Sequence, residues 1–389
     1  MNVPNQDGYD LWLRYLLIDN AERLAEYRAA IQQINFTAIF SPTLIAARDE
    51  LLRGLKGLLG IEIPVVDEIT HAASLSMFRA RIDVELNEGV SLEGRYYLMM
   101  HSEHGITISG LTDVGVLYGV FAFLRHLQMH RPLSELNTLS APKIQHRILN
   151  HWDNLDGTIE RGYAGHSLWD WHKLPDYLAP RYTDYARACA SIGINGTVLT
   201  NVNANALILT QQYLVKVAAL ANVFRPYGIR VYLTARFSAP IELGGLATAD
   251  PLDPAVIAWW QAKADEIYAL IPDFGGFVVK ANSEGQPGPH EYGRTHADGA
   301  NMLAQALAPH GGLSIWRAFV YSHEDAEDRH KQAYSELVPL DGTFQANAFL
   351  QVKNGAIDFM PREPYHPLFG AMPKTPLMLE VQITQEYLG

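Results

Sequence analysis

Lys280 and Glu284 stand out as residues whose types and spacing could do chemistry. They follow a short β-branched and aromatic run that ends in a Gly/Pro-rich loop, which is typical of the end of a strand. Burying such polar groups is costly unless they pair or act on a ligand. At the carboxyl end of a parallel strand, this is where an α/β barrel places its catalytic groups. We therefore predict that Glu284 is a catalytic acid and that Lys280 binds an anionic substrate, with a simple ion pair between them as the alternative.

Further charged residues lie at the ends of other predicted strands. Asp358 and Glu386 add two carboxylates, and Arg317 and Lys353 add two cations. Glycoside hydrolysis commonly uses a pair of carboxyl groups, one as acid and one as base or nucleophile. Three cations, with Lys280 included, are more than a neutral sugar needs but fit a substrate that carries a carboxylate. A set of structural salt bridges at strand ends is the alternative interpretation.

Metal ligation is a competing hypothesis for the same region. His290, His296 and Asp298 lie close together in the sequence, and His151 lies two residues before Asp153. Barrel metallohydrolases bind metals through such side chains at strand ends. However, the first predicted strand has no His-x-His motif, and His290 and His296 belong to a Gly/Pro-rich loop. We therefore expect no catalytic metal.

Repeated strand–helix units from Ile144 onward predict a parallel sheet that positions these side chains. A (β/α)₈ barrel needs eight strands to close, but only seven can be counted. We therefore expect a (β/α)₈ TIM barrel that is incomplete at its carboxyl end, over residues 141–389. The predicted strands are 148–152, 197–202, 229–235, 276–280, 314–319, 348–352 and 377–383.

The amino-terminal part has a different pattern and predicts a smaller α+β domain over residues 1–140. Residues 1–60 indicate helices, including a segment around 9–17. Alternating apolar residues then indicate strands, among them 82–86, 96–99 and 105–110. Thr112 is a candidate cap for an amphipathic helix over 113–129.

Composition limits the classes of function. The 389-residue chain has a net charge of −12, which argues against nucleic acid as its main partner. Cys189 is its only cysteine, which excludes an internal disulfide and a cysteine-based zinc site. No apolar run approaches the ~18–20 residues of a membrane span, and the first residues lack a secretory signal pattern. A cytoplasmic enzyme is the expectation.

Several long motifs resemble those of the glycoside hydrolase family 67 α-glucuronidases. They include Asn150-His-Trp-Asp-Asn-Leu-Asp-Gly and Val279-Lys-Ala-Asn-Ser-Glu-Gly-Gln-Pro-Gly-Pro. The other matching blocks are 159–165, 235–245, 292–302, 315–321, 353–359, 368–375 and 382–389. The resemblance begins near Tyr9 and is dense from Asn150 onward.

This resemblance implies an activity and a set of roles. Members of the family remove α-1,2-linked 4-O-methyl-D-glucuronic acid, or the unmethylated acid, from short glucuronoxylan oligosaccharides. They invert the anomeric centre and use no metal or cofactor. By matched motif, Glu284 resembles the general acid, and Asp358 with Glu386 resembles the pair that activates water. The matched substrate-binding residues are Lys280, Arg317 and Lys353 for the uronic carboxylate, Trp152, Glu160 and Arg161 in a sugar-binding block, and Val202 near the sugar O4.

Two departures from the family pattern qualify these expectations. His166 replaces the arginine of a usual Gly-Arg-Ser motif, which makes a cation near the pocket mouth titratable. Family members also continue for several hundred residues, completing the barrel and adding a helical domain that contributes to a homodimer. We expect that domain and its dimer contact to be missing here. The alternatives are therefore an inactive carbohydrate-binding fragment and, less favoured, a metal-dependent barrel hydrolase.

Overall fold

The computed structural model describes residues 8–36, 41–66, 74–79, 97–102, 105–320, 328–355 and 364–383. The chain forms two compact units. The first unit comprises Met1–Arg147, Ala179–Asn195 and Asn222–Ile229, and the second comprises Ile148–Leu178, Gly196–Ala221 and Arg230–Gly389. The domain boundary predicted between residues 140 and 141 stays a prediction.

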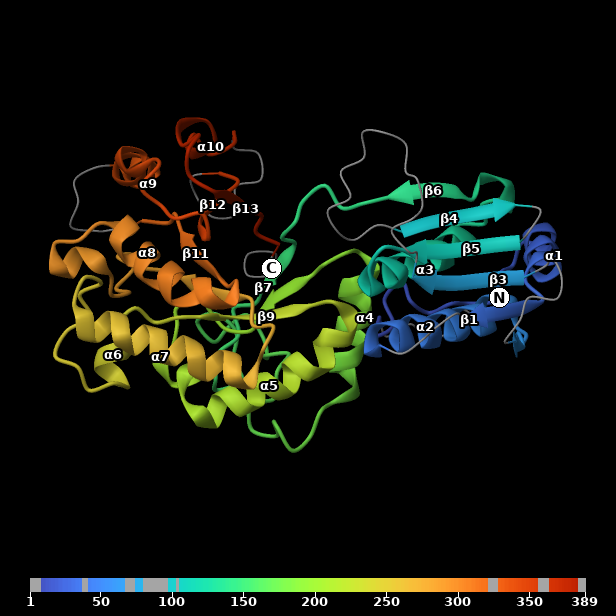
Figure 1. Cartoon of the computed structure of the whole chain (residues 1–389), viewed down its shortest axis with the longest axis horizontal. Coiled ribbons are helices and arrows are strands. Elements are labelled where there is room, and N and C mark those ends of the chain that lie inside the picture. The colour runs from blue at the N-terminus through green and yellow to red at the C-terminus, as the bar shows by residue number, and fades with distance from the viewer. Residues whose placement is uncertain are drawn as a thin grey trace. The chain divides into compact units, whose positions relative to one another are not determined.

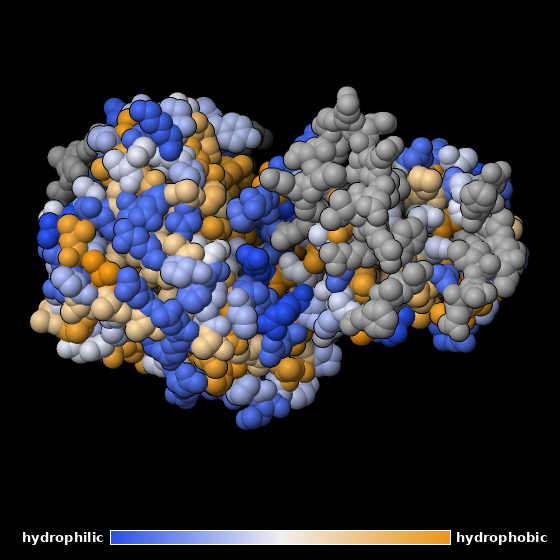
Figure 2. Space-filling view, in the orientation of Figure 1, coloured by the Kyte–Doolittle hydropathy of each residue, from blue (hydrophilic) through white to orange (hydrophobic). Residues whose placement is uncertain are grey.

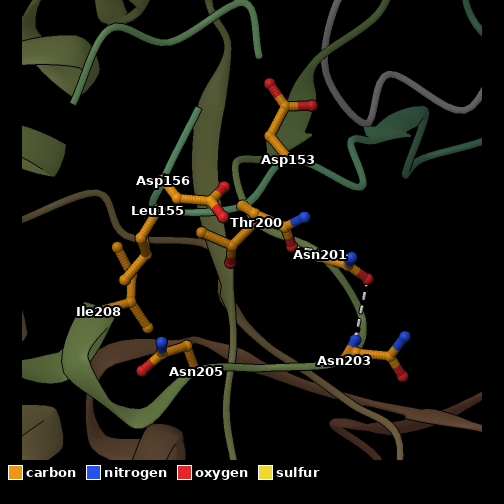
Figure 3. Close-up of a pocket in the computed structure, with 9 residues that line it drawn as sticks. Asp153, Leu155, Asp156, Thr200, Asn201, Asn203, Asn205 and Ile208 are labelled. Carbon is orange, nitrogen blue, oxygen red and sulfur yellow. Dashed lines mark hydrogen bonds between the residues drawn. The ribbon is translucent and has the colours of Figure 1, made fainter. Parts of the chain in front are cut away.

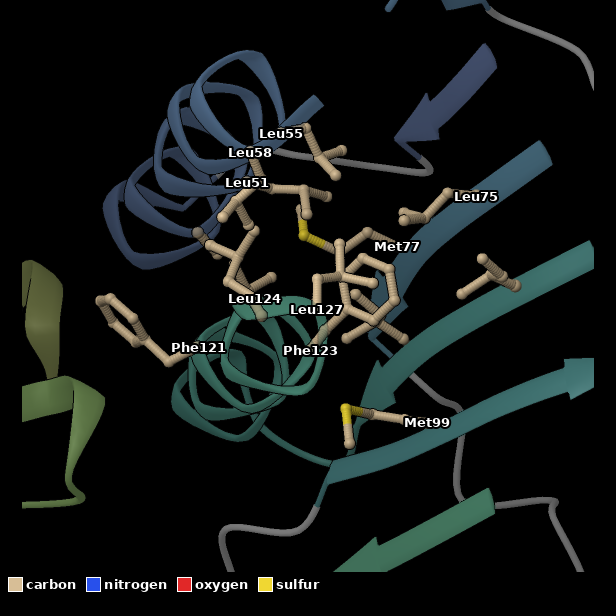
Figure 4. Packing of buried hydrophobic residues seen from close by; sticks show 14 of the residues in the cluster. Leu51, Leu55, Leu58, Leu75, Met77, Met99, Phe121, Phe123, Leu124 and Leu127 are labelled. Carbon is tan, nitrogen blue, oxygen red and sulfur yellow. The ribbon is translucent and has the colours of Figure 1, made fainter. Parts of the chain in front are cut away.

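Among its described residues, the first unit contains a six-stranded mixed sheet, with α2 and α3 packed against one face (Figures 1 and 4). The strand order is β2-β1-β3-β5-β4-β6, and β4 runs antiparallel to both of its neighbours. The elements of this unit are α1 (Ala21–Ala30), β1 (Gln33–Phe36), α2 (Pro42–Leu59), β2 (Val65–Val66), β3 (Ser74–Arg79), β4 (Tyr97–Ser102), β5 (Gly105–Gly110), α3 (Asp113–Gln128), η1 (Leu133–Glu135), β6 (Asn137–Ser140), α4 (Pro180–Ser191) and η3 (Arg225–Tyr227).

Close packing of α2 against α3 forms the core of this unit. Leu51, Leu55 and Leu58 of α2 are buried against the apolar face of α3, as Figure 4 shows. A Cβ atom on Gly54 would lie 2.5 Å from Leu124 Cδ2, so glycine is what lets the helices approach. Thr112 caps α3 as predicted, because its hydroxyl accepts a 3.1 Å hydrogen bond from the Gly115 N–H.

The helix predicted around residues 9–17 is wrong. Residues 8–20 contain turns but no helix, and polar groups in this segment form hydrogen bonds to residues distant in sequence. Trp12 Nε1 donates to Ser191 Oγ at 2.8 Å, and the Ile18 N–H donates to the Leu58 carbonyl at 3.0 Å. These tertiary hydrogen bonds outweigh the local preference for helix. Strand β1 was also missed. Its hydrogen bonds go to its parallel partners β2 and β3, which come later in the chain, so no local pattern marks it as a strand.

In the described part of the second unit, seven parallel strands form one sheet in the order β13-β12-β11-β10-β9-β8-β7. All seven predicted strands are present, which confirms an incomplete (β/α)₈ barrel preceded by a smaller α+β domain. Its strands are β7 (Ile148–Asn150), β8 (Gly196–Val198), β9 (Arg230–Thr234), β10 (Gly276–Val279), β11 (Leu313–Arg317), β12 (Ala348–Lys353) and β13 (Leu377–Glu380). The helices after α4 are η2 (Ala206–Leu209), α5 (Gln211–Phe224), α6 (Ala239–Glu242), α7 (Pro254–Leu270), η4 (Pro289–Tyr292), α8 (His296–Leu307), η5 (Ala308–His310), α9 (Arg329–Leu337), η6 (Val338–Leu340) and α10 (Leu368–Ala371).

One apolar layer runs across this sheet and holds the strands in register. Val198, Tyr232, Val278 and Ile315 come from four successive strands and are buried together. Gly276 has φ +131° and would place a Cβ 2.0 Å from the Leu313 carbonyl oxygen, so the start of β10 requires glycine. The carboxyl ends of β10–β13 are thereby aligned at one edge of the sheet.

The described surface mixes polar and apolar side chains. Figure 2 shows hydrophilic residues interspersed with small hydrophobic areas on the visible face, which is usual for a protein surface. Within the described ranges, no helix has the length and apolar character needed to span a bilayer.

Candidate active site

The structure brings the three predicted cations together around one aromatic ring, Phe319. Lys353 Nζ lies 3.3 Å from the ring centroid, and Lys280 Nζ and Arg317 Cζ each lie 5.9 Å from it. Their side chains are almost fully buried, at the carboxyl ends of β10, β11 and β12. Lys280, Arg317 and Lys353 are called the cation cluster below. Burying three positive charges side by side is unfavourable unless anions compensate them.

Glu284 is the first compensating anion. Lys280 Nζ donates to Glu284 Oε2 and, at 2.9 Å, to Asn203 Oδ1. Arg161 Nη2 lies 3.6 Å from the other carboxylate oxygen. Burial raises the pKa of Glu284, but the Lys280 hydrogen bond and the nearby positive charges more than offset it, so the pKa lies below its usual value. In this arrangement Glu284 is ionised.

Glu380 is the second compensating anion, and sequence reasoning missed it. Arg317 Nη2 donates to both of its carboxylate oxygens, at 2.9 and 3.1 Å. The Arg317 side chain is 2% exposed and that of Glu380 is 9% exposed, so the pair is protected from water. A signal was present, since Glu380 is the one charged residue of the otherwise apolar strand Leu377-Met-Leu-Glu.

Proximity and burial also shift the pKa values of the two lysines. For Lys353, burial and the Arg317 charge lower the pKa to about 6, although Glu380 and Glu284 act in the opposite direction. Burial likewise lowers the pKa of Lys280, and its contact with Glu284 only partly offsets this. Because its pKa is about 6, Lys353 gains a proton readily when an anion arrives nearby.

Two acidic residues of the site have a strained backbone. Glu160 has φ +53° and Glu284 has φ +49°, a left-handed conformation that non-glycine residues rarely adopt. Asn282, just before Glu284, has φ +50°. Its side-chain oxygen sits where a Cβ on Gly288 would be, at 2.1 Å. Such strain costs about 1–3 kcal/mol per residue and gathers at functional sites.

The loops after β7 and β8 contain the remaining predicted sugar contacts. Trp152 has its ring 5.9 Å from Arg317 Cζ, and Arg161 Nε lies 3.4 Å from Glu160 Oε1. Asn154 and Asn201 both donate to the Glu160 carbonyl, at 2.8 and 3.1 Å, and so hold this loop in place. Val202 is buried directly before Asn203. His166 is exposed and forms an isolated bridge with Thr158.

Asp358 and Glu386 lie outside the described residues. Their assignment as the base pair therefore stays a prediction. Of the predicted catalytic carboxylates, the structure places Glu284 with the cation cluster.

Two of the histidines considered as metal ligands lie together, but with Glu336 in place of Asp298. His290, His296 and Glu336 offer ligand atoms within 4.8 Å of one another. Asp298 lies in the first turn of α8, where its carboxylate accepts hydrogen bonds from Thr295, the N-cap residue. Trp316 Nε1 can only donate, and it contacts His296 Nδ1 at 3.1 Å. The neutral ring must then carry its proton on Nε2, which lies 3.1 Å from Glu336 Oε2. A metal at Nε2 would have to displace that proton, so this bonding opposes a metal site.

Comparison with known proteins agrees with the family resemblance. The profile of the family 67 amino-terminal domain matches residues 11–123, and that of the family 67 middle domain matches residues 126–389. The chain belongs to glycosyl hydrolase family 67. The alpha-glucuronidase A of Emericella nidulans is 41% identical to this family 67 chain, over 99% of the chain and 47% of the relative. The alpha-glucuronidase of Hypocrea jecorina is 38% identical, over 99% and 48%.

Two further facts set the scope of these matches. The chain spans about half the length of the curated relatives it matches. Among solved structures, a GH138 enzyme that targets pectin rhamnogalacturonan II is similar, with a TM-score of 0.52 and 14% identity over 83% of this chain and 38% of that chain. At such low identity the similarity extends to the fold alone.

Proposed function

We propose that this family 67 chain provides the uronate-binding and acid-donating part of an α-glucuronidase. The proposed reaction removes α-1,2-linked glucuronic acid, or its 4-O-methyl form, from short glucuronoxylan oligosaccharides. The observation that carries the proposal is the buried cation cluster beside Glu284. A carboxylate-bearing sugar is the ligand that such a cluster would favour over a neutral one.

Substrate binding would also prepare Glu284 to act as an acid. A uronate carboxylate that enters the cation cluster competes with Glu284 for Lys280. Losing that contact removes the main influence that keeps Glu284 ionised, while burial continues to favour the neutral acid. Glu284 then takes up a proton from solvent water and donates it to the glycosidic oxygen as the bond to the anomeric carbon breaks.

The second half of the proposed reaction is the attack of water on the opposite face of the sugar. We assign its deprotonation to Asp358 and Glu386, on the family resemblance alone. Inverting glycosidases hold acid and base about 6.5–9.5 Å apart, which leaves room for that water. The immediate product would then be the β-anomer of glucuronic acid.

The deciding experiment incubates the protein with glucuronic acid α-1,2-linked to xylobiose and follows the released anomer by NMR. We expect the β-anomer to appear first. Glu284→Gln should reduce turnover by about 10²–10⁴-fold, because it removes the acid while preserving side-chain shape. Binding of the oligosaccharide should persist in this variant. Unchanged turnover in Glu284→Gln would remove Glu284 from the mechanism.

A carbohydrate-binding role without catalysis is the second candidate. It is favoured by the ion pair that holds Glu284 ionised. In that case the protein would bind glucuronic acid with the same preference over glucose but release none from the oligosaccharide. The same incubation, combined with calorimetric binding, separates the two functions.

A further inference from the structure

A pocket of about 250 Å³ lies at the carboxyl ends of β7 and β8, and no role described so far uses it. Its lining comes from the loops that follow these two strands, as Figure 3 shows. Pockets for drug-sized ligands hold roughly 300–1,000 Å³, so this one suits a single sugar ring better than a longer ligand. We call it the amide pocket, and its lining residues are Asp153, Asn154, Leu155, Asp156, Thr200, Asn201, Asn203, Asn205 and Ile208.

The buried polar groups of the lining are already hydrogen-bonded within the protein. Asp153 Oδ2 accepts from Ser167 Oγ at 2.6 Å and from the Leu168 N–H at 2.9 Å. The Thr200 hydroxyl pairs with that of Thr234 at 2.6 Å. Asn201 donates to Asn154 Oδ1 at 3.0 Å. The floor and walls of the amide pocket are therefore fixed before any ligand arrives.

Polar atoms nearer the mouth remain available to a ligand. Asn205 uses Oδ1 to accept from the Leu207 N–H, and Asn203 uses Oδ1 for Lys280. Within the described structure, the Nδ2 amide of each has no hydrogen-bond partner. Asp156 uses Oδ1 for Thr158, which leaves Oδ2 as an acceptor. Two amide donors and one carboxylate acceptor are the groups with which proteins bind sugar hydroxyls.

The charge of the lining selects against a second anionic group. Asp153 and Asp156 line the amide pocket, and the described residues of its lining include no lysine or arginine. A uronate would be repelled here and attracted to the cation cluster. Asn203 connects the amide pocket to the cation cluster. Its side chain lines the amide pocket, and its Oδ1 accepts a 2.9 Å hydrogen bond from Lys280 Nζ. A cationic site for a carboxylate, next to a site for an uncharged ring, matches a substrate with one acidic and one neutral sugar.

We propose that the amide pocket is a subsite for a neutral pyranose ring, namely a xylosyl unit of the oligosaccharide whose uronate occupies the cation cluster. Leu155 and Ile208 provide an aliphatic surface for one face of the ring. The Nδ2 groups of Asn203 and Asn205 donate to ring hydroxyls, and Asp156 accepts from one. This inference deepens the proposed function and rests on it.

Calorimetry with two probes tests the subsite. The Glu284→Gln protein is titrated with D-glucuronic acid and with glucuronic acid α-1,2-linked to xylobiose, which it does not consume. We expect the second probe to bind about tenfold more tightly, from the added hydrogen bonds and apolar contact. Asn205→Asp preserves the Oδ1 that caps η2 but removes the amide donor and adds a negative charge. It should reduce the tenfold advantage to about threefold or less without changing the affinity for free glucuronic acid.

Two further variants make the result specific. Asp156→Asn retains an acceptor for Thr158 but replaces the free acceptor by a donor, and it should also reduce the advantage of the second probe. Asn137→Asp makes the same charge change as Asn205→Asp at an exposed site on β6 and should leave both affinities unaltered. Equal affinity for the two probes, or an advantage that survives both pocket variants, overturns the subsite while leaving uronate binding intact. Failure to bind glucuronic acid at all overturns the proposed function, and the subsite with it.

Discussion

At the scale of single residues, charge compensation determines how the candidate site is built. Arg317 and Lys280 are each paired with a carboxylate, and all three cations of the cluster face Phe319. Removing one partner of a buried ion pair leaves the other charge buried and uncompensated, which costs far more stability than losing a surface ion pair. The groups that we propose bind the uronate therefore also affect stability and its dependence on pH.

Arg317→Ala should weaken binding of glucuronic acid by about 10–100-fold, because hydrogen bonds to a charged group are worth about 1.5–3 kcal/mol. Binding of glucose should fall by no more than about threefold, since a neutral sugar makes no ion pair. Calorimetric titration of both sugars into the wild-type and variant proteins measures the ratio. An equal loss for both sugars would argue against recognition of the carboxylate.

Lys353→Met should change how stability depends on pH. Lys353 holds its proton up to a pH of about 10.4 in the unfolded chain, whereas in the folded protein it loses the proton above a pH of about 6. Between these values the unfolded chain binds more protons, so stability rises with pH in this window. From pH 6 to pH 8, the free energy of unfolding of the wild type should gain about 2 kcal/mol relative to the variant.

Urea denaturation at pH 6, 7 and 8 checks this prediction for Lys353. Lys331→Met, at an exposed position of α9, serves as the matched control. Its free energy of unfolding should change with pH as that of the wild type does. If the free energy of unfolding of Lys353→Met also changed with pH as that of the wild type does, Lys353 would be protonated in the folded protein throughout this range.

At the scale of elements, one buried network ties α4 to α2 within the first unit. Arg187 of α4 donates to both oxygens of Glu50 in α2, at 2.7 and 2.9 Å. Tyr15 donates to the same carboxylate at 2.6 Å. A helix that follows the first barrel strand in sequence is thus held by the α+β unit.

Removing Glu50 should destabilise this network strongly. Glu50→Ala leaves the buried Arg187 guanidinium without its main partner, and we expect a loss of about 3–5 kcal/mol in the free energy of unfolding. Asp49→Ala, one residue earlier in α2, removes an exposed ion pair with Arg48 and should cost at most about 1 kcal/mol. Thermal or urea denaturation of both variants makes the comparison. Equal, small losses would mean that water or rearrangement compensates Arg187.

At the scale of the whole molecule, the single cysteine provides a reporter of unfolding. Cys189 lies in α4 and is 4% exposed, and burial raises the pKa of its thiol to about 11. We expect a thiol reagent at pH 8 to leave the folded protein unlabelled and to react fully once urea unfolds the first unit. Mass spectrometry after timed exposure measures the labelled fraction. Rapid labelling without urea would show that α4 opens readily from the first unit.

Much of the fold followed from local patterns. The alternation of strands and helices identified all seven strands of the second unit, and Thr112 marked the start of α3. The cations at strand ends were found because polar residues interrupt apolar runs there. The helix prediction around residues 9–17 failed. The residue pattern there is helical, but the hydrogen bonds of this segment go to residues distant in sequence.

The sequence by itself determined the strands of the second unit, the family and the cations that we propose hold a uronate, because each of these is encoded by residues close together in the chain. Tertiary structure alone decided how those cations are neutralised. Glu380 is 63 residues from Arg317, and Asn203 is 77 residues from Lys280. No local pattern links such partners. They meet because parallel strands align their carboxyl ends at one edge of the sheet, where side chains from separate strands come within hydrogen-bonding distance.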